Sequence, residues 1–234
     1  MTAGASRARP EALTLFNPPA HPVTFPAVKP MPVIIALLLA VARAADGQQL
    51  VAPVPVEALT GQQVALLPLT LVAADPDLQS DSVYSRYQDR RTTLSWADSL
   101  IGEAFTGRAP EVQWVLPPTL RKLARRSPGI VGDPDQMGQA ALRAPKMRNL
   151  PDPLRSSLRN LMALVGGRVA MVPAALAFGR SADGRLQADL TLVAADTRSG
   201  KVLWRSVAVG SGENPDRALQ AALVAVLPLD SGGP

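Results

Sequence analysis

Side chains that commonly carry out chemistry are scarce in this sequence of 234 residues. It contains no cysteine, and its single histidine is His21, near the amino terminus. His21 lies before residue 45, in the part of the chain that we expect to be cleaved off, as argued below. The remaining chain has neither cysteine nor histidine, so it can build no thiol nucleophile, no Ser-His-Asp triad and no zinc site of Cys and His ligands. We therefore expect no catalytic, cofactor-binding or metal-binding residues and a protein that is not an enzyme.

Carboxylates and lysines are the remaining candidates for chemistry. Asp75, Asp77 and Asp81 lie close enough in sequence to bind Ca²⁺ together. Their segment lacks the glycine and the distal glutamate of an EF-hand, so a solvated loop is expected instead. Asp133 and Asp135 are typical of the start of a helix. No Ser-x-x-Lys, Gly-x-Ser-x-Gly or phosphate-binding glycine motif follows residue 44, which leaves a hydrolase based on carboxylates as the enzymatic alternative.

Basic side chains gather in one part of the chain. Residues 121–168 hold ten Lys and Arg against three Asp, whereas residues 45–120 hold four Arg against nine acids. The spacing of Arg121, Lys122, Arg125 and Arg126 places them along one side of a helix. Such a face is either solvated or docks to an acidic protein or an anionic polymer. The predicted partner-binding residues are Arg121, Lys122, Arg125, Arg126, Arg155 and Arg159.

The segment Met31–Ala45 predicts export. Val33–Ala42 is an apolar run of ten residues, and Ala42-Arg43-Ala44 has the form of a signal-peptidase site. We expect residues 31–44 to be a signal peptide cleaved between Ala44 and Ala45, since the run is too short to span a bilayer. Residues 1–30 are then an extension or follow a mis-assigned start, with Met31 as the true start. Without a cysteine no lipid anchor is expected, so the protein should be periplasmic or exported.

The first half of the mature chain alternates strands and helices. Gln63–Val72 reads as a buried strand in which Pro68 causes a bulge or marks an edge. A helix is expected over Thr93–Gly107, with Thr92 or Thr93 as its cap and Gly107 as its stop. A short strand at Val112–Leu116 precedes a helix from Pro117 to Arg126, and Asp133–Arg143 forms a small helix.

The second half begins with a helix and ends with another. Asp152 caps a helix that Gly166-Gly167 closes, and Val169–Phe178 is a strand. Leu186–Asp196 and Lys201–Gly210 form a hairpin whose turn needs Gly200 at positive φ. Val207 and Val209 are expected in the core, with a bulge between Trp204 and Val207. Trp96, Trp114 and Trp204 read as core or half-buried, and a helix after Asn214-Pro215 runs to Pro228.

This order, β-α-β-α-α-β-β-β-α, predicts an α/β fold in one domain, with a mixed sheet of about five strands covered by helices. The domain is expected over residues 61–228. Residues 45–60 form a linker, because Pro53 and Pro55 stand among small apolar residues, and residues 229–234 form a tail.

Two local patterns resemble a group of bacterial envelope proteins. Gln63–Thr70 (QVALLPLT) is similar to their opening strand, and Leu190–Trp204 (LTLVAADTRSGKVLW) is similar to their Asp-Gly-Trp hairpin. The group includes the curli-secretion lipoprotein, the lipoprotein that activates penicillin-binding proteins, and the amino-terminal domain of the Tol-Pal translocation protein. The resemblance covers roughly Gln62–Pro228, and its specific part is about twenty-five residues.

The resemblance implies a non-catalytic protein that binds or assembles with envelope components. An envelope protein or an anionic envelope polymer is the expected partner, nucleic acid is not, and no integral membrane span is expected. The oligomeric state stays open. A regulator of cell-wall synthesis and an accessory subunit of a secretion assembly are the alternatives within this group. A pore is disfavoured because Ala73–Arg91 and Ser127–Leu150 lack the long alternation of a membrane hairpin.

Overall fold

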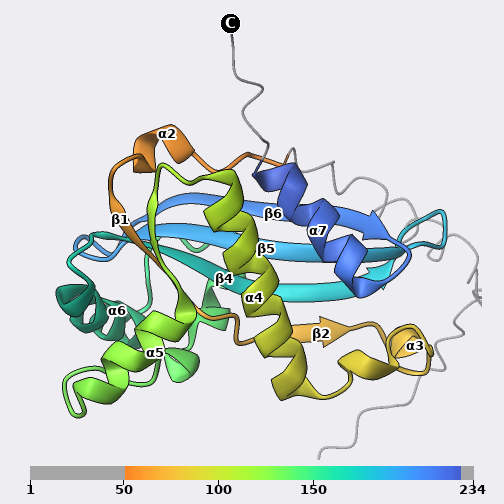
Figure 1. Cartoon of the computed structure of the whole chain (residues 1–234), viewed down its shortest axis with the longest axis horizontal. Coiled ribbons are helices and arrows are strands. Elements are labelled where there is room, and N and C mark those ends of the chain that lie inside the picture. The colour runs from red at the N-terminus through yellow and green to blue at the C-terminus, as the bar shows by residue number, and fades with distance from the viewer. Residues whose placement is uncertain (1–50, 228–234) are drawn as a thin grey trace, which may run out of the picture. The chain divides into compact units, whose positions relative to one another are not determined.

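The computed structural model describes residues 51–227 (Figure 1), so the predicted signal peptide and leader lie outside the described residues. Within this range the chain forms one α/β domain, which confirms the predicted fold class. The sheet has six strands rather than about five. The difference arises at Pro68, because the expected first strand is divided into β1 (Gln63–Leu66) and β2 (Val72–Ala74).

The sheet is parallel on one side and antiparallel on the other. Its order is β3-β1-β4-β5-β6, and β2 pairs with β4 in line with β1. The strands β1, β2 and β3 (Gln113–Val115) are mutually parallel with β4 (Val169–Arg180), while β4, β5 (Leu186–Asp196) and β6 (Val202–Gly212) are antiparallel. Within residues 51–227 no further strand pairs with the outer edges of β2 and β3 or with much of β6.

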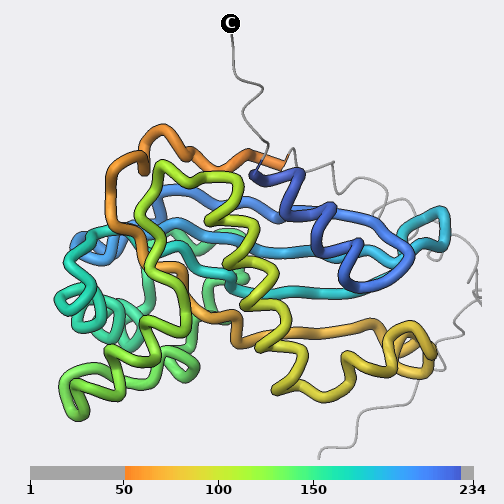
Figure 2. Tube along the Cα trace, in the orientation of Figure 1, coloured from red at the N-terminus to blue at the C-terminus, as the bar shows by residue number. Residues whose placement is uncertain are grey.

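Two helices cover one face of the sheet (Figure 1). Helix α4 (Arg90–Arg108) and helix α7 (Pro215–Val226) contribute Ala97, Ile101 and Phe105, and Leu219 and Leu223, to one core. The chain enters this layer beside the end of α7, where the Val54 amide donates to the Val226 carbonyl at 2.9 Å (Figure 2). Short helices α2 (Val56–Leu59) and α3 (Pro76–Gln79) lie before and after the first two strands.

The opposite face has a second core. Helix α5 (Pro117–Arg126) and helix α6 (Asp152–Val165) pack there with 3₁₀ helices at Pro134–Gln136 and Gln139–Arg143. Leu120 of α5 and Leu158 of α6 are fully buried in this layer. A third 3₁₀ helix, Ser85–Tyr87, precedes α4 on the first face. The expected helix over Asp133–Arg143 is therefore two short helices, separated by Gly138 in the left-handed conformation.

Helices α4 and α6 begin at other residues than predicted. Helix α4 starts at Arg90, because Asp89 Oδ1 accepts from the Thr92 amide at 2.8 Å, so neither Thr92 nor Thr93 is the cap. The helix continues through Gly107 to Arg108. Asp152 is the first helical residue of α6 rather than its cap. Gly166, at φ 85°, ends α6 as predicted.

The inward face of β6 also differs from the prediction. Ser206, Ala208 and Gly210 point toward α7 and are buried, while Val209 is exposed on the other face. The register shifts where Ala194 pairs with Trp204 and Ala195 with Val202, which leaves Leu203 as the extra residue. The bulge therefore lies before Trp204, and it reverses which side chains of β6 face the core. Gly200 has φ 77° in the hairpin turn, as expected.

Candidate docking site between α4 and α5

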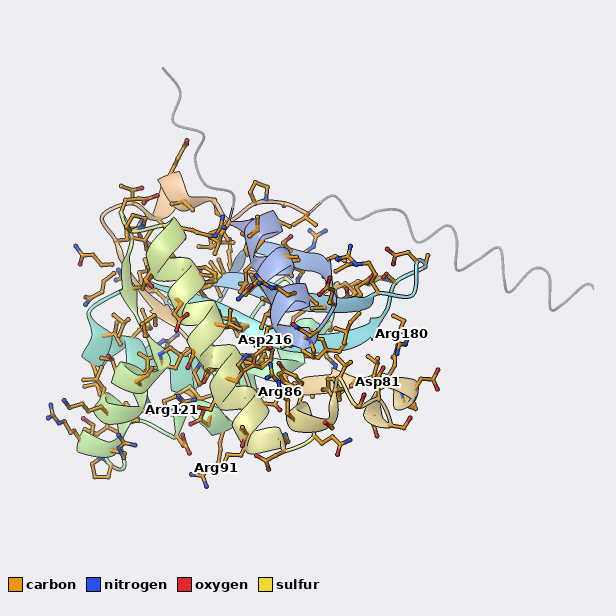
Figure 3. All side chains as sticks on the ribbon, turned by 45° about the vertical axis from the view of Figure 1, so that its right-hand side comes forward. Asp81, Arg86, Arg91, Arg121, Arg180 and Asp216 are labelled. Atoms are coloured by element: carbon orange, nitrogen blue, oxygen red, sulfur yellow. The ribbon has the colours of Figure 1, made fainter. Side chains whose placement is uncertain are left out.

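The predicted basic side chains occupy different environments on α5. Leu120 and Ala124 are buried, so the opposite side of the helix is turned outward, and Lys122, Arg125 and Arg126 are exposed on it. Arg121 is only partly exposed and points toward α4 (Figure 3). The exposed group Lys122, Arg125 and Arg126 is called the α5 basic surface below.

Arg121 joins three segments through hydrogen bonds. Its Nη2 donates to Asp98 Oδ2 of α4 at 2.6 Å and to Asp135 Oδ1 at 2.7 Å, and its Nε donates to Asp135 Oδ2 at 2.8 Å. These two carboxylates raise the pKa of Arg121 above its ordinary value. The contacts hold α4, α5 and the 3₁₀ helix at Pro134–Gln136 together. The charge of Arg121 is thus largely neutralised by these two carboxylates.

Asp98 is the buried end of this network. Its side chain is 7% exposed, and Oδ1 accepts the Leu69 amide at 2.7 Å. Burial raises the pKa of Asp98, although the Leu69 amide and Arg121 oppose that shift. Asp98 thereby provides a hydrogen-bond acceptor for the Leu69 amide, which follows Pro68. Strand β1 has already ended there, so no neighbouring strand provides an acceptor for this amide. The sequence predicts only that Asp98 lies in a helix and does not indicate that its side chain accepts a backbone amide.

The other two predicted residues lie on α6. Arg159 is exposed, whereas Arg155 is partly buried with its Nε enclosed. Arg155 packs against Gly200, since a Cβ built there would lie 2.7 Å from Arg155 Nε. The six predicted side chains therefore do not form one continuous exposed face. Arg121 is bonded within the fold, Arg155 is partly buried against Gly200, and the remaining four side chains are exposed.

A groove lies beside the α5 basic surface. Its volume is about 790 Å³, and its lining includes arginines from two helices: Arg90 and Arg91 at the start of α4 and Arg121 and Arg125 of α5. Asp89 and Asp135 also line it, but Asp89 caps α4 and Asp135 pairs with Arg121. The structure thus adds Arg90 and Arg91 to the predicted residues. Arg90 and Arg91 lie in a different helix, more than twenty-five positions before the start of α5, so sequence spacing gave no reason to group them.

A second polar cluster lies on the same face as α7 (Figure 3). Asp216 accepts hydrogen bonds from Arg86, from the Tyr87 hydroxyl and from Trp96 Nε1, the last at 2.7 Å. Burial disfavours its ionisation, but these donors outweigh that effect and lower the pKa of Asp216. Burial and the bond to Asp216 raise the pKa of Tyr87 to about 12. All members of this cluster are engaged with each other, so we assign it to stability.

Trp96, Trp114 and Trp204 are half-buried, as predicted. Trp114 Nε1 donates to the Ala109 carbonyl at 2.8 Å, and its ring packs against Phe105. Between residues 51 and 227 no group of acidic or histidine side chains has the arrangement of a metal site. None of the helices in this same range is long and apolar enough to cross a membrane.

Solved structures to which the chain is similar include members of the group that Gln63–Thr70 and Leu190–Trp204 resemble, at low identity and low TM-score. The C-terminal domain of LpoB from Escherichia coli is 11% identical, and the match covers 75% of this chain and 94% of that chain at a TM-score of 0.32. The PelC dodecamer from Paraburkholderia phytofirmans is 12% identical over 71% and 88%, also at 0.32.

Lipoprotein GNA1162 from Neisseria meningitidis is 14% identical, with 64% of this chain and 81% of that chain covered at a TM-score of 0.31. No protein-family model and no curated protein sequence matches the chain. At such low identities and TM-scores the likeness concerns the order of helices and strands. No functional argument is drawn from it.

Proposed function

We propose that this chain is an exported, non-catalytic binding protein of the bacterial cell envelope. The α5 basic surface docks to an acidic envelope protein or an anionic envelope polymer. One observation carries the proposal: Lys122, Arg125 and Arg126 are exposed together on one helix, and Arg90 and Arg91 extend the positive charge across the adjoining groove. Clustered cations of this kind attract anionic partners and speed their encounter.

The environment of the carboxylates supports a binding role over a hydrolytic one. A carboxylate hydrolase needs two acids that face a shared substrate. In the groove Asp135 and the nearby Asp98 are both bonded to Arg121, and Asp89 is bonded to the Thr92 amide. Each acid is thus committed to a contact within the fold, which leaves the exposed arginines as the groups available to a ligand.

Site-specific cross-linking in the native envelope tests this proposal. Benzoylphenylalanine in place of Arg126 should cross-link a discrete partner, and the same group in place of exposed Arg217 on α7 should not. Changing Lys122 and Arg125 to Glu should abolish the product because it reverses the attraction, while Arg121 is kept so that the fold is unaffected. Equal cross-linking from both positions, or no effect of charge reversal, would refute docking at this surface.

A further inference from the structure

Strand β2 has a free edge. It pairs only with β4, and no other strand of residues 51–227 lies on its outer side. Figure 1 shows β2 at the lower margin of the sheet, between α3 and the start of α4. An exposed edge is a template for a further strand unless a charge, a proline or a bulge on the strand blocks it. Val72–Ala74 carries none of these.

The hydrogen bonds of β2 define which backbone groups face outward. The Leu71 carbonyl accepts from the Leu176 amide, and the Asp75 amide donates to the Phe178 carbonyl, both at 2.9 Å. In a parallel pair the residues that bond to the neighbouring strand alternate with residues that point away. Val72 and Ala74 therefore present their N–H and C=O groups on the side away from β4.

Most of these outward groups have no partner in the described chain. The Ala74 carbonyl receives only a long contact from Gln79 Nε2, at 3.4 Å. Among residues 51–227 no side chain or loop amide bonds to the Val72 amide, the Val72 carbonyl or the Ala74 amide. They are thus available as two donors and one acceptor along a short strand.

An open cavity of about 590 Å³ lies against this edge. It is lined by Val72, Ala73 and Ala74 of β2 together with Gln79, Tyr84, Tyr87, Gln88, Arg90 and Thr93. Small and aromatic side chains thus flank the free backbone groups, and the glutamines supply further hydrogen-bonding groups. The volume suits a few residues of extended chain laid beside β2.

Arg90 is the one charged residue of this lining. Its Nη2 donates to the Thr70 carbonyl at 2.7 Å, which fixes the guanidinium near the start of β2. Within the described residues no carboxylate forms an ion pair with it, so its other N–H groups can receive an anion. A ligand with a single carboxylate would therefore complement the charge of this cavity.

We propose that β2 binds an extended peptide segment of a partner protein as an added strand. The segment pairs its backbone with Val72 and Ala74, fills the cavity with small apolar side chains and places a carboxylate on Arg90. Backbone pairing supplies affinity in such complexes, and the pockets and charge supply selectivity. This site adjoins the α5 basic surface and shares Arg90 with its groove. Lys122, Arg125 and Arg126 lie outside the β2 cavity, so either proposal can fail without the other.

A synthetic heptapeptide of alternating Thr and Val that ends in Glu is the probe. Titrated into isotope-labelled protein, it should shift the amide resonances of Val72 and Ala74 and slow their exchange with solvent. The same heptapeptide ending in Lys should bind about tenfold more weakly, because it lacks the carboxylate for Arg90. Both peptides are amidated at the carboxyl terminus, so that the Glu side chain is the one carboxylate available. Protection of both amides before any peptide is added would overturn the proposal, since it would mean that this chain or a second copy already covers the edge.

Three variants make the test specific. Ala74→Pro removes an outward N–H without touching the ladder to β4 and should abolish binding of both peptides. Arg90→Glu should reverse the preference between the peptides, whereas Arg217→Glu, the same charge change at an exposed position of α7 outside both cavities, should leave it intact. Should Ala74→Pro fail to fold, the amide shifts and the comparison of Arg90→Glu with Arg217→Glu still decide. Binding that does not involve Val72 and Ala74 would overturn the proposal.

Discussion

Single residues in this protein show why a charge pattern does not equal a binding surface. Helical spacing groups Arg121 correctly with Lys122, Arg125 and Arg126 on α5. Spacing does not reveal that Asp98, twenty-three positions earlier, is buried beneath Arg121 and needs its charge. The exposed cations of α5 were therefore predictable from sequence. The addition of Arg90 and Arg91 and the bonding of Arg121 within the fold were not, because both depend on how two helices pack.

Arg121→Met should destabilise the protein strongly, since it leaves Asp98 buried without its cationic partner. Breaking a buried pair in this way costs about 3 kcal/mol of the free energy of unfolding. Lys122→Met is the matched control, as its side chain is exposed and should change stability by less than about 0.5 kcal/mol. Chemical denaturation of both variants measures the difference. Equal effects would show that the network around Arg121 contributes little.

The free energy of unfolding should depend on pH through the carboxyl group of Asp196. Its Oδ2 accepts from Arg168 Nη2 at 2.5 Å, and its Oδ1 accepts from the Arg198 amide at 2.8 Å. These bonds, chiefly those from Arg168, lower the pKa of Asp196 well below its ordinary value. A carboxyl whose pKa is lower in the folded state stabilises the protein above its unfolded pKa, and this contribution is lost as pH falls through the folded pKa.

Asp196→Asn should therefore be less stable than the unmodified protein at neutral pH. The difference should narrow as the pH falls from about 5 to about 2, because in this range the carboxyl takes up a proton in the unfolded state while the folded state still resists protonation. Asp77→Asn, at an exposed position of α3, serves as the control and should show no comparable narrowing. Thermal unfolding across this pH range measures the effect, and a constant difference would contradict it.

Among the secondary-structure elements, the sequence predicts the positions of most helices and strands. It does not predict strand ends and bulges that depend on tertiary contacts. Periodicity located α5, α6, β4 and β5 within a few residues of their observed bounds. It could not show that Pro68 ends β1 rather than bulging it, because the outcome depends on Asp98 accepting the Leu69 amide. It also placed Val209 in the core, since the bulge at Leu203 is not visible in the pattern.

Close packing of α7 on β6 depends on Gly210. A Cβ there would lie 2.0 Å from the Ala222 amide nitrogen and 2.5 Å from the Ala218 carbonyl oxygen, so the helix would have to move. Gly210→Ala should lower the free energy of unfolding by about 2 kcal/mol, the usual effect of overpacking. Gly107→Ala in α4 meets no atom within 4 Å and should instead stabilise by about 0.5 kcal/mol. Opposite signs in denaturant titrations would confirm this packing.

The molecule as a whole combines a nearly neutral domain with a localised positive surface. Residues 45–234 carry 20 basic and 18 acidic side chains, so attraction to an anionic partner comes from their placement and not from net charge. The α5 basic surface and the free edge of β2 are linked by Arg90, which lines both cavities. The fold offers two adjacent surfaces on which one partner, or two, could dock.

Salt should weaken binding at the α5 basic surface more than binding at β2. Exposed charges are screened within about 8 Å at physiological ionic strength, whereas strand pairing rests on backbone hydrogen bonds. Cross-linking from position 126 should therefore fall steeply between low and high salt, and binding of the Glu heptapeptide should fall only modestly. The same salt dependence for both would contradict separate modes of binding.

The proposal of an envelope partner depends on export of the protein. Export is tested by the amino-terminal sequence of the protein recovered from the bacterium that makes it, with its compartment established by fractionation. We predict a chain that begins at Ala45 and is found in the periplasmic or extracellular fraction. A chain that begins at Met1, Thr2 or Met31 and remains in the cytoplasm would contradict export and with it the proposed function.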